Sequence, residues 1–216
     1  MSELDPVHIK RALLRLRSAR AIREVFGANG HMFILNPTLS EAEVRTFETQ
    51  HEITLPTDYR KFLLRIGNGG AGPYYGVFPL GQMDDMNGMR PWLENDGFVG
   101  VLSEAFALTS AWNDLTGMPS EDVMDDEEGE YEKQFDQFQN RYWRASLMNG
   151  ALPICHEGCA LRIWIVVTGE QAGQLWRDRR AEFMGVERVL AADGTPATFS
   201  RWYNEWLESA ICAAAS

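Results

Sequence analysis

The sequence is poor in cysteine, has no long apolar run and shows no export signal. Only three of its 216 residues are cysteines, and such an odd, sparse set favours reduced thiols over a disulfide framework. No apolar run approaches the roughly 18 residues that a membrane-spanning helix needs. The first residues, MSELDPVHIKR, contain no apolar segment typical of a signal peptide. We therefore expect a cytoplasmic protein with no membrane partner.

Common catalytic and phosphate-binding motifs are also missing. No Gly-x-Ser-x-Gly elbow, His-Glu-x-x-His pair or Gly-Lys-Ser/Thr sequence occurs. The glycine-rich run 67–72 follows a predicted helix, whereas a phosphate-binding loop precedes one. The acidic run 121–132 fails as a calcium loop, because Met124 and Phe135 stand where an EF-hand needs carboxylates. From these patterns we assign no cofactor, no catalytic residue and no metal ligand.

Charge is abundant but unevenly spread along the chain. The formal net charge is −11, while hydrophobic residues make up 45% and aromatic residues 11% of a globular composition. Residues 1–30 carry six cations against three acids, whereas residues 84–136 carry 15 acids against Arg90 and Lys133. Such a field repels nucleic acid and favours a basic partner, mainly by raising the rate of association.

The stretch 55–81, LPTDYRKFLLRIGNGGAGPYYGVFPLG, organises the rest of the chain. Tyr59, Phe62, Leu63 and Ile66 recur at helical spacing and predict a helix with a wide buried face. Gly67 stands where a left-handed C-terminal cap is expected. A loop rich in glycine follows, and then an apolar strand with Val77, Phe78 and Leu80.

The remaining elements predict a single α+β domain. Asp5-Pro6 starts a helix that we expect to end at Gly27, and Ser40 with Glu43 forms a capping box for the next one. The strand at 161–168 is apolar on both faces and should be central in its sheet. Further strands are predicted at 152–155, 174–178 and 183–190, one or two within 98–108, and helices at 112–118, 131–147 and from about 198 or 200 onward.

Three stretches carry a family resemblance. The run 55–81, the run ICHEGCALRIWIVVTGEQAGQLWRD and the later FSRWYNEWL together resemble the SUKH superfamily over roughly residues 39–207. The resemblance implies a mixed or antiparallel sheet with packed helices, with residues 1–38 as a helical extension of a SUKH-like domain at 39–216. It also implies a non-enzymatic, protein-binding domain, which in bacteria typically acts as an immunity protein that neutralises a toxin.

Two other interpretations stay open at this point. Cys155, His156 and Cys159 include a cysteine pair at zinc-ligand spacing, which would suit a cysteine- or metal-dependent hydrolase. No second pair accompanies them, and neighbouring strand residues such as Cys155 and His156 point to opposite faces. The third interpretation is a cytoplasmic regulatory scaffold, as in the fungal members of the superfamily.

We expect the partner to be a basic toxin domain and assign its contacts to loops. Trp92 follows Pro91 in a polar loop, so it is the tryptophan that we expect to be exposed and to serve as an interface anchor. The acidic side chains would guide the partner into place. The candidate partner-binding residues are Asn68, Tyr74, Tyr75, Asp84, Asp85, Trp92, Asp125, Asp126, Glu127 and Glu128.

Overall fold

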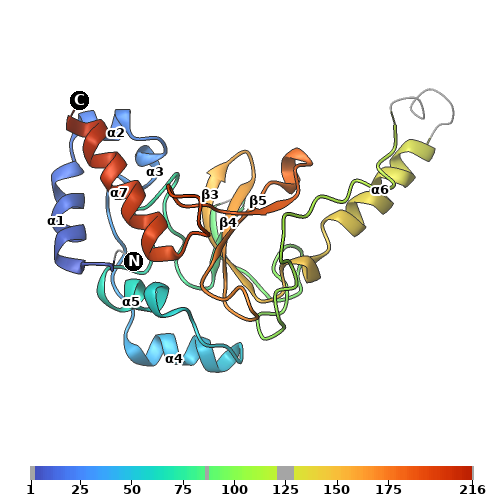
Figure 1. Cartoon of the computed structure of the whole chain (residues 1–216), viewed down its shortest axis with the longest axis horizontal. Coiled ribbons are helices and arrows are strands. Elements are labelled where there is room, and N and C mark those ends of the chain that lie inside the picture. Colours follow the sequence, from blue (N-terminus) through green and yellow to red (C-terminus); the bar gives the residue numbers. More distant parts are fainter. Residues whose placement is uncertain (1–2, 86–87, 121–128, 216) are drawn as a thin grey trace.

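The computed structural model describes residues 3–85, 88–120 and 129–215. Within them the chain forms seven α-helices and two antiparallel sheets (Figure 1). The helices are α1 (Pro6–Leu16), α2 (Ala19–Glu24), α3 (Ala28–His31), α4 (Glu41–Gln50), α5 (Thr57–Arg65), α6 (Glu130–Tyr142) and α7 (Phe199–Ala215). The strands are β1 (Gln82–Asp85), β2 (Gly88–Pro91), β3 (Ala151–Gly158), β4 (Leu161–Val166), β5 (Leu175–Asp178) and β6 (Val186–Arg188). The predicted α+β class is confirmed.

The main sheet has the order β3-β4-β5-β6, and β1 pairs with β2 in a separate hairpin. Consecutive strands pair antiparallel, with Trp164 of β4 opposite Trp176 of β5. Ile163, Trp164, Ile165 and Val166 of β4 are all fully buried. The prediction of a central strand that is apolar on both faces is therefore confirmed.

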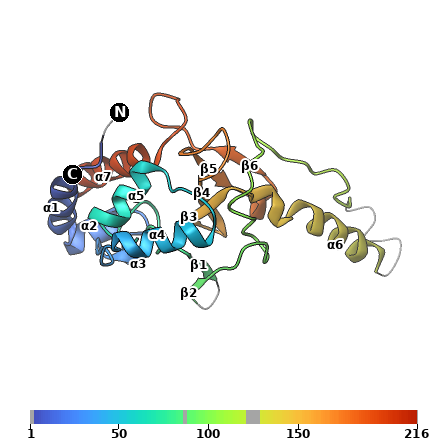
Figure 2. The same ribbon diagram turned by 90° about the horizontal axis from the view of Figure 1, so that it is seen from below.

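Most helices lie together beside one end of the sheet, while α6 extends away from the opposite end (Figures 1 and 2). Helices α1 and α2 pack against α7, and α5 packs against both α4 and α7. Leu13 of α1, Phe62 of α5 and Leu207 of α7 belong to the same buried cluster as the strands of the main sheet. The first and last segments of the chain thus share one hydrophobic core with its centre.

The helix predicted from Pro6 to Gly27 is wrong, because the structure divides it in two. Helix α1 ends at Leu16, and Ser18 begins α2 by accepting a hydrogen bond from the Ala21 amide at 3.2 Å. A serine at this position offers the backbone a new N-terminal cap. Gly27 then turns the chain at φ 74° and leads into the short α3.

Gly67 does not adopt the left-handed conformation that we predicted. Helix α5 is followed by Ile66 in a right-handed conformation, and the positive φ angles occur at Gly69 and Gly70. A Cβ on Gly67 would lie 2.9 Å from the Asn36 carbonyl oxygen. Gly67 therefore serves the close approach of residues 35 and 36, and the turn comes two residues later.

The strand predicted at Val77, Phe78 and Leu80 is wrong, because among these described residues only Val77 forms bridges, to Gly70 and Cys155. Two further predicted elements are also wrong. No strand of either described sheet lies within 98–108, where the Val101 and Leu102 amides donate to the side chains of Asn149 and Glu94. The described part of the segment 112–118 contains no helix, because Trp112 pairs with Val186 of β6 in an extended bridge. In both places, residues distant in sequence bind the backbone hydrogen-bonding groups that a local helix or strand would have used.

Among the described residues, no helix combines the length and apolar character required to cross a bilayer.

Candidate partner-binding surface

The glycine loop between α5 and β1 folds against the outer edge of β3. Gly70 and Val77 exchange backbone hydrogen bonds of 2.8 Å, and Val77 also bridges to Cys155 of β3. Gly69 adopts φ 79°, and a Cβ there would lie 2.5 Å from the Val77 carbonyl oxygen. The loop is therefore a tight hairpin that only glycine permits at this position.

Tyr74 and Tyr75 lie at the tip of this hairpin and meet an aromatic side chain that the sequence analysis missed. The Phe26 ring is 6.3 Å from Tyr74 and 5.6 Å from Tyr75 in edge-to-face arrangements. Phe26 is 63% exposed and Tyr75 43% exposed. We call Phe26, Tyr74 and Tyr75 the aromatic cluster. In the sequence, the only hint that Phe26 is exposed is its position directly before Gly27.

A partly buried ion pair between Glu157 and Arg177 supports Tyr74 of the aromatic cluster. Glu157 of β3 is almost fully covered and accepts hydrogen bonds from the Arg177 Nε of β5 at 2.8 and 3.0 Å. The Arg177 Nη2 also donates to the Tyr74 hydroxyl at 3.2 Å. Burial, and then the nearby Glu157 carboxylate, raises the pKa of Tyr74 to about 12. The hydroxyl therefore stays protonated and fixes the ring against the sheet.

Asp84 joins a second network beside Tyr75. Its carboxylate lies 3.0 Å from His156 Nδ1 and 3.3 Å from Arg162 Nε. The His156 ring lies 5.5 Å from the Tyr75 ring. Asp85 forms a 2.7 Å ion pair with Arg90 across the β1–β2 hairpin. Both carboxylates thus already face cations within the protein, which weakens any field that they project toward a partner.

Asn68 lies in the same loop, but its side chain supports the loop itself. Its Oδ1 accepts a hydrogen bond from the Leu80 amide at 2.8 Å, and its main-chain carbonyl accepts from Asn36 Nδ2 at 2.9 Å. The first bond joins the two ends of the hairpin, and the second ties the loop to the segment that precedes α4. The residue shapes the surface that Tyr74 and Tyr75 present.

The expectation that Trp92 is exposed is wrong. Only 8% of Trp92 is accessible, and its ring packs 6.1 Å from Phe47 and 5.5 Å from His51 at the end of α4. The Trp92 amide donates to the Gly81 carbonyl, which turns the chain inward after β2. Its neighbour Leu93 is 69% exposed instead. Trp92 therefore cannot act as an exposed interface anchor in this conformation.

The other acidic candidates, Asp125, Asp126, Glu127 and Glu128, lie outside the described residues. The structure does not relate them to the aromatic cluster or to Asp84 and Asp85.

The Cys155–His156–Cys159 segment does not have the geometry of a thiol or metal site. Cys155 is fully buried, its Sγ donates to the Pro73 carbonyl at 3.3 Å, and burial raises its pKa well above the usual range. A thiol held in its protonated form is a poor nucleophile and a poor zinc ligand. Cys159 is exposed at the β3–β4 turn. No three metal-binding side chains come together in the part of the chain that the structure describes.

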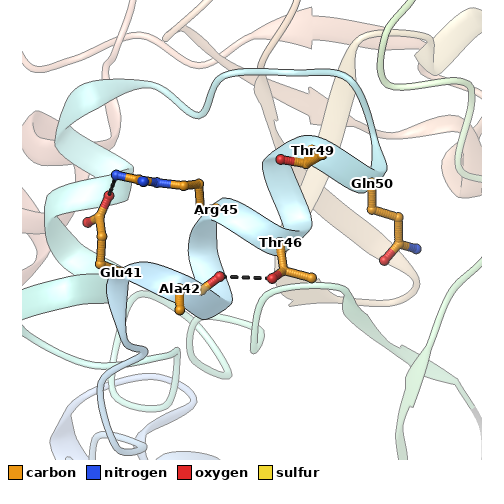
Figure 3. A pocket seen from close by; sticks show the side chains of 6 residues that line it. All are labelled: Glu41, Ala42, Arg45, Thr46, Thr49 and Gln50. Atoms are coloured by element: carbon orange, nitrogen blue, oxygen red, sulfur yellow. Dashed lines mark hydrogen bonds and ion pairs between the residues drawn. The ribbon is translucent and has the colours of Figure 1, made fainter.

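A hollow on the outer face of α4 is the subject of Figure 3. Its labelled residues, from Glu41 to Gln50, all belong to that one helix. Glu41 is paired with Arg45 and with Arg60 of α5. A hollow bounded by a single solvated helix face offers no enclosed site, so we assign it no function.

Together these observations define an α+β domain whose best-supported surface feature is an aromatic cluster, in which the partly buried Glu157–Arg177 ion pair holds Tyr74. Comparison with the profiles of known families then identifies the class of protein to which the chain belongs. The profile of the SMI1 / KNR4 family (SUKH-1) matches residues 38–193, more than half of the chain, and the chain belongs to this family. The predicted SUKH relationship is confirmed. No curated protein and no solved structure gives a significant match.

Proposed function

We propose that this protein is a non-catalytic binding domain of the immunity type, which neutralises a toxin by forming a stoichiometric complex with it. Membership of the SMI1 / KNR4 family (SUKH-1) carries the proposal. The buried, protonated Cys155 supports it, because this state removes the most plausible nucleophile from the rival hydrolase interpretation.

The aromatic cluster is the contact that we propose for the partner. Tyrosine and phenylalanine supply large contact area at a small cost in side-chain entropy, and the Glu157–Arg177 pair fixes Tyr74 before binding. We further propose that the partner is a basic toxin domain. The strong negative charge of the chain, with six carboxylates and no cation in residues 121–128, favours such a partner.

A bacterial cytoplasm is the compartment that we propose. Cys155 and Cys159 are thiols outside any disulfide, which fits a reducing environment.

Growth rescue by co-expression tests the proposal. The toxin domain encoded by the reading frame beside this gene is expressed from an inducible promoter with and without the protein. We expect growth only when both are present, and a one-to-one complex by calorimetry. The double variant Phe26→Ala/Tyr75→Ala should abolish rescue, while Val7→Ala, at a 66% exposed site on α1, should retain it. Rescue unaffected by the double variant would exclude the aromatic cluster as the contact.

A further inference from the structure

A groove of about 350 Å³ runs between α2, the tip of the glycine loop and α7. Helices α2 and α7 lie side by side in both views of the fold (Figures 1 and 2). The groove is continuous with the aromatic cluster, because Phe26 and Tyr74 belong to both. The residues that matter here are Glu24, Phe26, Tyr74, Glu205, Trp206 and Ser209.

The groove combines aromatic walls with negative charge. Phe26, Tyr74 and Trp206 provide ring surfaces, and the described residues that line it include two carboxylates but neither lysine nor arginine. Glu205 is paired with Arg201 at 3.1 Å, so the exposed Glu24 carries most of the uncompensated charge. Aromatic faces and a carboxylate together attract a cation with an apolar stem.

The groove also depends on parts of the chain outside the family match. Helices α2 and α7 lie before and after residues 38–193, and only Pro73 and Tyr74 come from within that range. The shared fold therefore supplies one wall, and the chain's own terminal segments supply the others. Such an arrangement suits a feature that distinguishes one partner from another.

We propose that this groove receives a lysine or arginine side chain, flanked by apolar residues, from the protein partner. The proposal rests on the proposed function and adds a specificity site to it. The cation lies against the Phe26 and Tyr74 rings and pairs with Glu24. Apolar neighbours in the partner segment cover Val25 and Ala210 at the base of the groove.

Titration of the full-length, ¹⁵N-labelled protein with blocked tripeptides tests this site without the toxin. The probes are acetyl-Leu-Arg-Leu-amide and acetyl-Leu-Glu-Leu-amide. We expect saturable shift changes for the arginine peptide at the Trp206 indole and at residues 24–26 and 73–74, and binding at least about fivefold weaker for the glutamate peptide. Absence of saturable changes at the groove, or equal binding of both peptides, would overturn the proposal.

Variants on the groove and on the far side of α7 sharpen the test. Glu24→Lys should weaken binding of the arginine peptide about two- to fivefold. Ser209→Trp, a change at an exposed position that lines the groove, should abolish binding of the peptide by filling the groove. Glu208→Lys makes the same charge change on an exposed residue that does not line the groove, and it should leave binding unaltered. Binding that survives Ser209→Trp would refute the site.

The two proposals fail separately. Peptide binding without toxin rescue would contradict the immunity function alone, whereas toxin binding by a protein that ignores both peptides would contradict the groove alone.

Discussion

At the scale of single residues, the glycine loop depends on Gly69 for both its φ angle and its close approach to Val77. We predict that Gly69→Ala lowers the free energy of unfolding by about 3 kcal/mol or more, because strain at positive φ adds to a backbone clash. Gly97→Ala is the matched control: Gly97 has φ 77°, but nothing lies within 4 Å of an added Cβ. The free energy of unfolding of that variant should fall by only about 1–2 kcal/mol. Equal losses in urea unfolding would refute the clash.

His31 should make stability depend on pH in the acid range. Burial lowers its pKa from 6.5 to about 4, and its Nδ1 accepts a hydrogen bond from the Phe33 amide at 3.0 Å. Between pH 6.5 and 4 the unfolded chain binds a proton that the folded protein excludes. The contribution of neutral His31 to the free energy of unfolding is therefore fully present above pH 6.5. It declines as pH falls to 4, by at most about 3 kcal/mol.

Replacement of His31 tests this dependence. Urea unfolding at pH 7, 5 and 4 should show a shallower acid decline for His31→Gln than for the native protein, although the variant is less stable at pH 7. His8→Gln, which changes an exposed histidine on α1, should keep the native slope. An unchanged slope in His31→Gln would contradict the assignment.

At the scale of elements, the N-terminal helices are part of the main core. Leu13 of α1 is 1% exposed and belongs to the buried cluster that includes α7. We predict that Leu13→Ala costs about 2–5 kcal/mol and lowers a single cooperative transition. Val7→Ala, on the exposed side of the same helix, should change stability by less than about 0.5 kcal/mol. A separate early transition would instead make residues 1–38 an independent unit.

Elements with strong local signals were predictable from the sequence, and those set by distant contacts were not. The Ser40 capping box and the apolar β4 strand lie where the pattern places them, because their determinants are adjacent in sequence. The composition of the segment 98–108 predicts a strand, yet the Val101 and Leu102 amides in it donate to the side chains of Asn149 and Glu94. Periodicity contains no information about such partners.

The same distinction applies to the proposed contact surface. Tyr74 and Tyr75 stood out because a glycine loop presents them, but burial of Trp92 depends on Phe47 and His51, more than 40 residues earlier. Phe26 joins the tyrosines only after α2 and α3 fold back onto the loop. A polar sequence context is therefore a poor guide to exposure when a hairpin such as β1–β2 turns its next residue inward.

At the scale of the whole molecule, net charge should control how fast the partner arrives. The chain carries −11, and residues 121–128 contribute six carboxylates without a cation. Asp84 and Asp85, by contrast, already face Arg162 and Arg90. A concentration of like charges along the chain produces a long-range field that accelerates association with an oppositely charged protein. The acidic run should therefore act on the association rate constant, and the aromatic cluster on the dissociation rate constant.

Reversal of Asp125, Asp126, Glu127 and Glu128 to lysine tests this division. At low ionic strength we expect the association rate constant with the toxin domain to fall about tenfold or more, with little change in dissociation. The difference should shrink at 0.5 M salt, because screening shortens the range of the field. Phe26→Ala/Tyr75→Ala should show the opposite pattern in surface plasmon resonance, with faster dissociation and nearly native association. An association rate constant unaffected by the four reversals would show that the field of this segment does not steer the partner, whatever the aromatic cluster contributes.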